Sequence, residues 1–189
     1  DQLDRFSKEN PQLSVEIYRR KFSELRSDIS TDYMDLIFTT SYECNQLSAD
    51  EYNFLQLKEV PLVAYMHKNH PLAHKEVLEI EDLRAERLLM VDQASSSGYF
   101  DFIRQLFLVR NIHPLIAQYA HDGGEHIGSI LFDKGILLAS QCFLENSWED
   151  QIARVPIHNV KIYVTAIWKK RNTNPVLLKF LQSIIDSSD

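Results

Sequence analysis

The chain has 189 residues and a mass of 22.1 kDa, which is enough for one domain or two small interleaved lobes and too little for most multidomain enzymes. A composition of 44% hydrophobic and 25% charged residues is that of a globular protein with a packed core, and it excludes wholesale disorder. Twenty Lys and Arg against 27 Asp and Glu give a formal net charge of −7, whereas domains that grip nucleic-acid phosphates are usually basic. We therefore expect no direct nucleic-acid binding by this chain.

The two cysteines, Cys44 and Cys142, are far apart and fit neither a disulfide framework nor a zinc site with thiolate ligands. We expect two reduced thiols. The chain has no apolar run of about 18 residues, so we expect no contact with a membrane. Residues 1–10 lack the basic and apolar regions of a signal peptide, and the chain starts at Asp1 without a Met. We expect a fragment of a longer, cytoplasmic protein.

The first 38 residues predict a helix, a strand, a second helix and a second strand. Leu3 and Phe6 share a helical face, and the helix ends at Asn10-Pro11 because proline disfavours the helical conformation of the residue before it. Apolar residues at 13, 15 and 17 alternate with polar ones, which is the period of a half-buried strand. Helical spacing returns over 22–29 and a short strand follows at 35–38, so we expect a β-α-β unit and a parallel sheet covered by helices.

The rest of the chain continues this alternation. Residues 54–58 and 61–66 predict two strands or one long bent ribbon. Further strands are expected at 87–91, 115–120, 136–139 and 160–168, with helices between them that carry Phe100, Ile103 and Phe107, and then Ile127, Ile130 and Leu131. Thr173-Asn174-Pro175 predicts the start of a last helix. The expected buried stripe of that helix is Leu177, Leu178, Leu181, Ile184 and Ile185.

The common nucleotide-binding and serine-nucleophile motifs are absent from the sequence. Histidines gather over 67–74 and 121–126, but a solvated loop and a glycine pair favour ordinary loops there over metal sites. We predict no catalytic residue, no metal and no cofactor. A Cys–His nucleophile pair built on Cys44 or Cys142 stays open as the enzymatic alternative, because its members need only meet in space.

Hydroxyl-bearing residues follow two of the expected strands. Ser95, Ser96 and Ser97 precede an aromatic-faced helix, so their hydroxyls and the first N–H groups of the helix are suited to bind an anion. Thr39 and Thr40 stand in the equivalent place after the 35–38 strand. In open α/β sheets ligands bind beyond the carboxyl ends of strands, and the alternatives are a plain helix cap and an ordinary polar turn.

With its elements in this order, the chain resembles the effector-binding domain of LysR-type transcriptional regulators. The resemblance covers essentially the whole chain and rests on Pro61-Leu62-Val63, on His70-Pro71-Leu72-Ala73 with Asp82-Leu83 ten residues later, and on a closing segment with Trp168 and Pro175. The chain departs from the family at Asp133-Lys134-Gly135, where Gly-x-Gly is usual, and at Ser140, where a proline is usual.

The resemblance implies an α/β fold of the type 2 periplasmic-binding-protein kind, with two interleaved Rossmann-like lobes joined by crossover hinge strands. Lobe I would comprise 1–64 plus 166–189, and lobe II 65–165. A small-molecule effector would bind in the cleft, shift the hinge angle and thereby control transcription. The expected ligand-binding residues are Thr39, Thr40, Gln93, Ser95, Ser96, Ser97, Asp122 and Gly123.

The resemblance also implies partners. A homodimer through this domain is expected, with a dimer or tetramer for the full-length protein, and DNA would be bound only by a winged helix-turn-helix that precedes Asp1 together with the first strand of lobe I. Hydroxyls and helix N-termini favour a carboxylate effector, while an apolar or aromatic one stays open. The alternative function is that of an exported solute-binding protein of a transporter.

Overall fold

The structure is a computed structural model that describes residues 2–144 and 148–185. Within these ranges, no helix combines the length and the apolar character needed to cross a bilayer.

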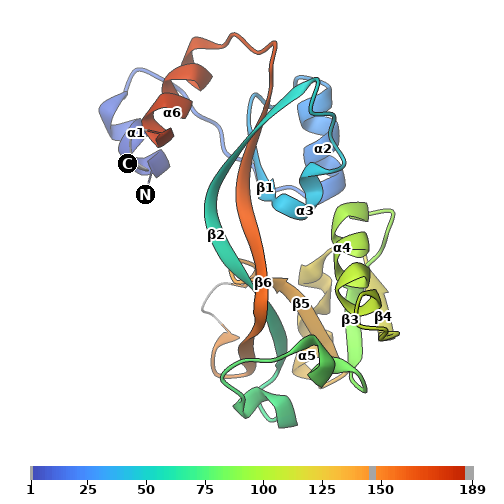
Figure 1. Cartoon of the computed structure of the whole chain (residues 1–189). Coiled ribbons are helices and arrows are strands. Elements are labelled where there is room, and N and C mark those ends of the chain that lie inside the picture. The colour runs from blue at the N-terminus through green and yellow to red at the C-terminus, as the bar shows by residue number, and fades with distance from the viewer. Residues whose placement is uncertain (1, 145–147, 186–189) are drawn as a thin grey trace.

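One six-stranded sheet in the order β1-β6-β2-β5-β3-β4 runs through the molecule. Its two long strands, β2 (Tyr52–His67) and β6 (Ile152–Lys169), are antiparallel and connect the two ends of the molecule (Figure 1). β1 (Ile37–Thr40) pairs with β6 near one end, and β5 (Ile136–Ser140) pairs with β2 toward the other end. β3 (Arg87–Val91) and β4 (Leu115–Ala120) complete the sheet.

The helices fall into two groups at the two ends of these long strands (Figure 1). The upper body contains β1 and four helices: α1 (Gln2–Glu9), α2 (Phe22–Ser30), α3 (Ser41–Cys44) and α6 (Pro175–Ile185). The lower body contains β3, β4 and β5, the helices α4 (Ser97–Leu108) and α5 (Ile127–Leu131), and three single-turn 3₁₀ helices, Pro71–His74, Ile80–Leu83 and Gly123–His126.

The core of the lower body lies on both faces of the sheet, as the alternation of β2 shows. Leu62, Ala64 and Met66 belong to the apolar cluster that includes α4, whereas Val63 and Tyr65 belong to the cluster that includes Ile130 of α5. Successive side chains of a strand point to opposite faces, so this single strand contributes to both cores. Tyr65 is fully buried, and its hydroxyl donates to the Ser140 carbonyl oxygen at 2.9 Å.

Most of the elements expected from the sequence are present. α1 ends before Asn10-Pro11, and the Asn10 side-chain amide donates back to the Phe6 carbonyl at 2.9 Å. α6 begins at Pro175, where the Asn174 side chain accepts a hydrogen bond from the Val176 N–H at 3.0 Å. The stretches 54–58 and 61–66 form one strand, β2, with register irregularities at Gln56/Lys58 and Pro61/Val63. The long bent ribbon is therefore confirmed.

Three expectations are wrong. The strand expected over 13–17 is absent, because residues 14–21 pair with no strand of the described chain, and Val15 and Ile17 stay 40% and 72% exposed. The β-α-β unit expected there is therefore not formed. The sheet is mixed and not parallel throughout: β3 pairs in parallel with β4 and β5, while β1, β6, β2 and β5 pair antiparallel. Leu178 and Ile185 lie on the solvent side of α6, at 51% and 46% exposure.

Candidate functional site

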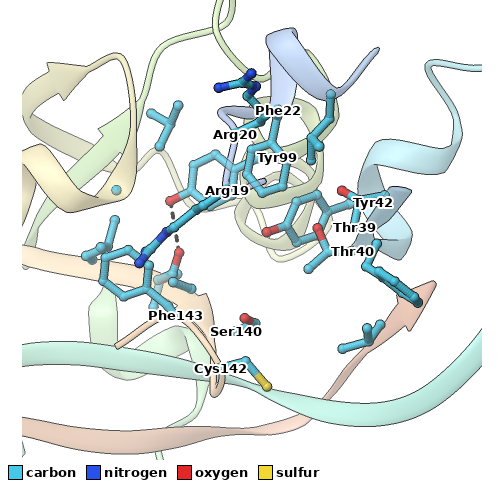
Figure 2. A pocket seen from close by; sticks show the side chains of 18 residues that line it. Arg19, Arg20, Phe22, Thr39, Thr40, Tyr42, Tyr99, Ser140, Cys142 and Phe143 are labelled. Atoms are coloured by element: carbon cyan, nitrogen blue, oxygen red, sulfur yellow. Dashed lines mark hydrogen bonds between the residues drawn. The ribbon is translucent and has the colours of Figure 1, made fainter. Parts of the chain in front are cut away.

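A cavity of about 350 Å³ lies between the upper and lower bodies (Figure 2). This volume lies within the range of pockets that hold small molecules. The upper body contributes Arg19, Arg20, Phe22, Leu25, Phe38, Thr39, Thr40, Tyr42 and Val164 to its wall. The lower body contributes Val91, Tyr99, Gly123, Leu137, Leu138, Ala139, Ser140, Cys142 and Phe143.

The ends of two strands place the polar groups of this wall. Thr39 and Thr40 end β1, and Ser140 ends β5. The Oγ1 atoms of Thr39 and Thr40 are buried, and neither makes a hydrogen bond of ordinary geometry within the described residues. A buried hydroxyl without a partner is costly, so these two groups favour a polar ligand or water beside them. Gly123 fits only because it lacks a side chain, since a Cβ there would come within 2.6 Å of the Phe143 ring.

Of the residues expected to bind the effector, the structure places Thr39, Thr40 and Gly123 in the cavity wall. The others expected on the same grounds are not part of that wall: Gln93, Ser95, Ser96, Ser97 and Asp122. Gln93 is exposed, and the Ser95 hydroxyl donates to Asp92 Oδ2 at 3.1 Å. Contact of any of these residues with an effector stays a prediction.

Ser96 is completely buried at the start of α4, where it meets Glu43 of α3. The Ser96 hydroxyl donates to Glu43 Oε1, and the same oxygen accepts the Tyr99 N–H at 3.1 Å. Arg26 of α2 binds the other carboxylate oxygen at 2.5 Å. The anion expected at this helix N-terminus is therefore a carboxylate of the chain itself.

This Glu43 contact lies in a close junction between the two bodies. α3 lies beside the upper end of α4 (Figure 1), and the rings of Tyr42 and Tyr99 meet edge to face at a centroid distance of 5.8 Å. Gly98 allows the approach, because a Cβ there would lie 2.3 Å from the Tyr42 carbonyl oxygen. Tyr42 also stacks on Phe102 at 5.3 Å. We call the contacts of Glu43 with Arg26, Ser96 and the Tyr99 N–H the Glu43 clasp.

A second, more exposed contact joins the bodies through Lys21. The Lys21 ammonium lies 3.3 Å from Asp122 Oδ2 and 3.5 Å from Glu125 Oε1. Partial burial pushes the pKa of Asp122 upward, but the Lys21 ammonium and the N–H groups of Glu125 and Gly124 outweigh it and hold this pKa below its usual value. Asp122 thus acts in the structure as a partner of Lys21.

Two sites could suggest an enzyme, namely the side chains around His121 and the thiol of Cys44, but neither is suited to catalysis. Ser95 Oγ and Asp92 Oδ2 approach the same ring nitrogen of His121, Nδ1, at 3.4 and 2.9 Å. A nucleophile and an orienting carboxylate need opposite nitrogens of the base, so this group does not form a nucleophile–base pair. Burial raises the pKa of the Cys44 thiol, which disfavours the reactive thiolate.

The sequence reasoning missed the two arginines of the wall, Arg19 and Arg20, and the buried Glu43. Arg19, Arg20 and Lys21 form a run of three cations directly after the alternating residues 13–18, and that run was the available signal. For Glu43 the sequence offers no comparable signal, because a carboxylate in a four-residue helix gives no sign of the distant helix it will meet.

Comparison with known proteins agrees with the fold. The family model described as the LysR substrate binding domain matches residues 1–189. Among curated proteins, the HTH-type transcriptional regulator TtuA of Agrobacterium vitis is 27% identical over 143 residues, which cover 68% of this chain and 45% of TtuA. The Hca operon transcriptional activator HcaR of Escherichia coli is 26% identical over 133 residues, which cover 69% of this chain and 45% of HcaR. The chain thus spans about half the length of the curated relatives it matches.

Solved structures show the same fold at low sequence identity. The effector-binding domain of QuiR in complex with shikimate has a TM-score of 0.82 at 19% identity, with 99% of this chain and 88% of that chain covered. The regulatory domain of Synechocystis CcmR in complex with 2-PG has a TM-score of 0.80 at 16% identity, with coverages of 100% and 89%. Full-length CbnR bound to its target DNA has a TM-score of 0.82 at 18% identity, with coverages of 100% and 65%. The match of the family model over the whole chain shows that this chain belongs to the LysR substrate-binding domain family.

Proposed function

We propose that this domain is the ligand sensor of a LysR-type transcriptional regulator and binds a small carboxylate effector in the cavity between the two bodies. The observation that supports this most directly is that both bodies line one cavity of about 350 Å³. Its wall contains two arginines, and also two threonines whose hydroxyls have no hydrogen-bond partner within the described residues. A ligand that contacts both walls favours one relative position of the bodies, and that bias is the signal.

We further propose that the upper and lower bodies are the two lobes expected from the sequence, with lobe I formed by 1–64 plus 166–189 and lobe II by 65–165. The long strands β2 and β6 would act as the hinge, because they connect the bodies and β2 carries register irregularities at Gln56/Lys58 and Pro61/Val63. A bulge bends a strand locally and interrupts its hydrogen-bond ladder. DNA binding would belong to a separate part of the full-length regulator, which would act in the cytoplasm.

A homodimer through this domain is part of the proposal. Large apolar side chains are exposed on both bodies, including Ile17 in the upper body and Leu115 and Tyr119 on the edge strand β4. Exposed apolar surface of this kind marks protein interfaces. Light scattering on a size-exclusion column is expected to give twice the mass of the chain for the wild type, and Ile17→Asp and Tyr119→Lys are each expected to shift the protein toward monomer.

The test of the sensor role is a thermal-shift screen of the domain against several hundred small metabolites, followed by titration of each hit. A ligand at 100 times its dissociation constant adds about 2.7 kcal/mol to the free energy of unfolding. We expect at least one saturable shift, which Thr40→Ala weakens. Failure of every metabolite to shift the transition would contradict the proposal. The family match is to regulators and not to exported solute-binding proteins, so the regulatory role is the one we propose.

A further inference from the structure

The two walls of the cavity differ in charge. The upper wall contains Arg19 and Arg20 as well as Thr39 and Thr40. The lower wall, as far as the described chain forms it, has no charged residue: it consists of apolar side chains together with glycine, serine and cysteine. Positive charge is therefore available at one end of a bound ligand and not at the other.

Arg19 is the cation available to a ligand. Arg20 is engaged elsewhere, because its Nε lies 3.3 Å from Asp28 Oδ2 and its guanidinium stands over the Tyr18 ring at 5.1 Å. Arg19 has no hydrogen-bond or ion-pair partner in residues 2–144 and 148–185. Figure 2 shows the Arg19 side chain projecting into the cavity, whereas that of Arg20 turns away.

The other positive groups near the cavity are already neutralised. The N-terminus of α4 holds the Glu43 carboxylate, which also binds Arg26. Lys21 lies between Asp122 and Glu125 of the lower body, at 3.3 and 3.5 Å. A second carboxylate on a ligand would thus point either at apolar side chains or toward these acidic residues.

Aromatic rings make up much of the remaining wall. Phe22 and Tyr42 come from the upper body, and Tyr99 and Phe143 from the lower one. The Tyr99 hydroxyl donates to the Leu138 carbonyl oxygen at 2.9 Å, so its ring and not its hydroxyl is left for the cavity. Rings pack well against a flat apolar group in offset or edge-to-face arrangements.

We infer that the effector is a monocarboxylate with a ring-shaped apolar body, whose carboxylate pairs with Arg19 and whose ring packs between the aromatic side chains of the two walls. This inference rests on the proposed function, since it names the ligand class of the same cavity. The guanidinium presents two parallel donors to a carboxylate. A dicarboxylate of the same shape would leave its second charge unpaired.

Three compounds of nearly equal shape test the inference: 4-methylbenzoate, 4-methylbenzamide and terephthalate, which carry one, no and two negative charges. Ligand-observed NMR, with each compound titrated up to millimolar concentration, measures its dissociation constant from the purified protein in whichever oligomeric state it adopts. We expect 4-methylbenzoate to bind at least about tenfold more tightly than either analogue, because the amide cannot form the ion pair and terephthalate buries an unpaired charge. Terephthalate or the amide binding as tightly as 4-methylbenzoate would overturn the inference.

Two variants assign the charge to Arg19. Arg19→Gln is expected to weaken the binding of 4-methylbenzoate about tenfold and to leave the binding of 4-methylbenzamide nearly unchanged. Loss of folding would weaken the binding of both compounds. Arg84→Gln removes the same charge from an exposed site outside the cavity and is expected to change neither affinity. Equal weakening of acid and amide by Arg19→Gln would refute the assigned role.

The metabolite screen separates this inference from the function on which it rests. If some metabolite binds saturably but none of the three ring compounds does, or if the hits are dicarboxylates, the sensor role stands and the ligand class is wrong. If no compound of either set binds, the sensor role itself is wrong. Binding of 4-methylbenzoate that depends on Arg19 supports both.

Discussion

Replacement of Glu43 tests how strongly the two bodies are held together. The Glu43 side chain is 3% exposed, and Glu43→Ala leaves the half-buried Arg26 without its ion-pair partner and removes one of the two acceptors of the Tyr99 N–H. Removing one partner of a buried ion pair costs about 3–5 kcal/mol. The Arg26 side chain is 23% exposed and can reach water, and Ser96 Oγ still accepts the Tyr99 N–H at 3.3 Å, so we expect a loss near the lower limit, about 3 kcal/mol.

Urea unfolding followed by circular dichroism measures this loss directly. For a domain of this length about 3 kcal/mol corresponds to a fall in Tm of about 6–12 °C. Glu43→Gln keeps the volume and one oxygen acceptor and is expected to lose about half as much, because hydrogen bonds to charged groups are about twice as strong as neutral ones. Glu76→Ala removes an exposed carboxylate and serves as the control. A loss below about 0.5 kcal/mol for Glu43→Ala would refute the reasoning.

Four further substitutions test other parts of the structure. Gly98→Ala is expected to lower the free energy of unfolding by about 1–3 kcal/mol, because its Cβ would lie 2.3 Å from the Tyr42 carbonyl oxygen. Gly128→Ala in α5 is expected to raise it by up to about 1 kcal/mol, because nothing lies within 4 Å of its Cβ. An equal loss in both variants would contradict the close approach at Gly98. Lys169, helped by Arg171, holds the pKa of Asp32 below its usual value, so its carboxylate stabilises the fold above about pH 3.9 and ceases to do so as the pH falls through the lowered pKa. Asp32→Asn should therefore be less stable than the wild type at pH 7, and the difference should shrink as the pH falls below about 3.9. A difference in urea midpoints that does not change with pH would argue against this. Tyr65→Phe removes the Tyr65 hydroxyl donor from the Ser140 carbonyl oxygen, which keeps the Phe143 N–H at 2.9 Å, and is expected to cost about 1 kcal/mol in the same assay. An unchanged midpoint would show that the hydroxyl bond contributes nothing.

The sequence predicted local structure well wherever a local signal decides it. Asn10-Pro11 ends α1 and Asn174-Pro175 begins α6, because proline and a capping side chain act within a few residues. The strand expected over 13–17 failed for the opposite reason. Alternation describes a surface that can be half buried, but a strand exists only where a neighbour pairs with it, and the described chain provides none for residues 14–21.

The candidate site shows the same limit. Three serines before a helix led us to expect an anionic ligand or a plain cap at the N-terminus of α4, and in the structure Glu43 of α3, 53 residues away in the sequence, binds there. Local sequence could not indicate that partner, since it depends on the packing of α3 against α4. Thr39 and Thr40 end a strand and Gly123 follows one, and all three lie in the cavity wall, where this fold class puts a ligand; that they bind an effector stays a prediction.

The Glu43 clasp is also expected to affect the apparent affinity for an effector, because it joins the two bodies that line the cavity. The clasp joins the two bodies in the arrangement that forms the cavity, so it raises the fraction of molecules that are competent to bind an effector. When only a fraction of the molecules is competent to bind, the apparent dissociation constant rises by the inverse of that fraction. Glu43 is not part of the cavity wall, yet Glu43→Ala should weaken the binding of 4-methylbenzoate and of 4-methylbenzamide by the same factor. Arg19→Gln, in contrast, should weaken the binding of 4-methylbenzoate alone. Unchanged affinity in a folded Glu43→Ala protein would show that the bodies stay joined without the clasp, through the contact of Tyr42 with Tyr99 and the long strands alone.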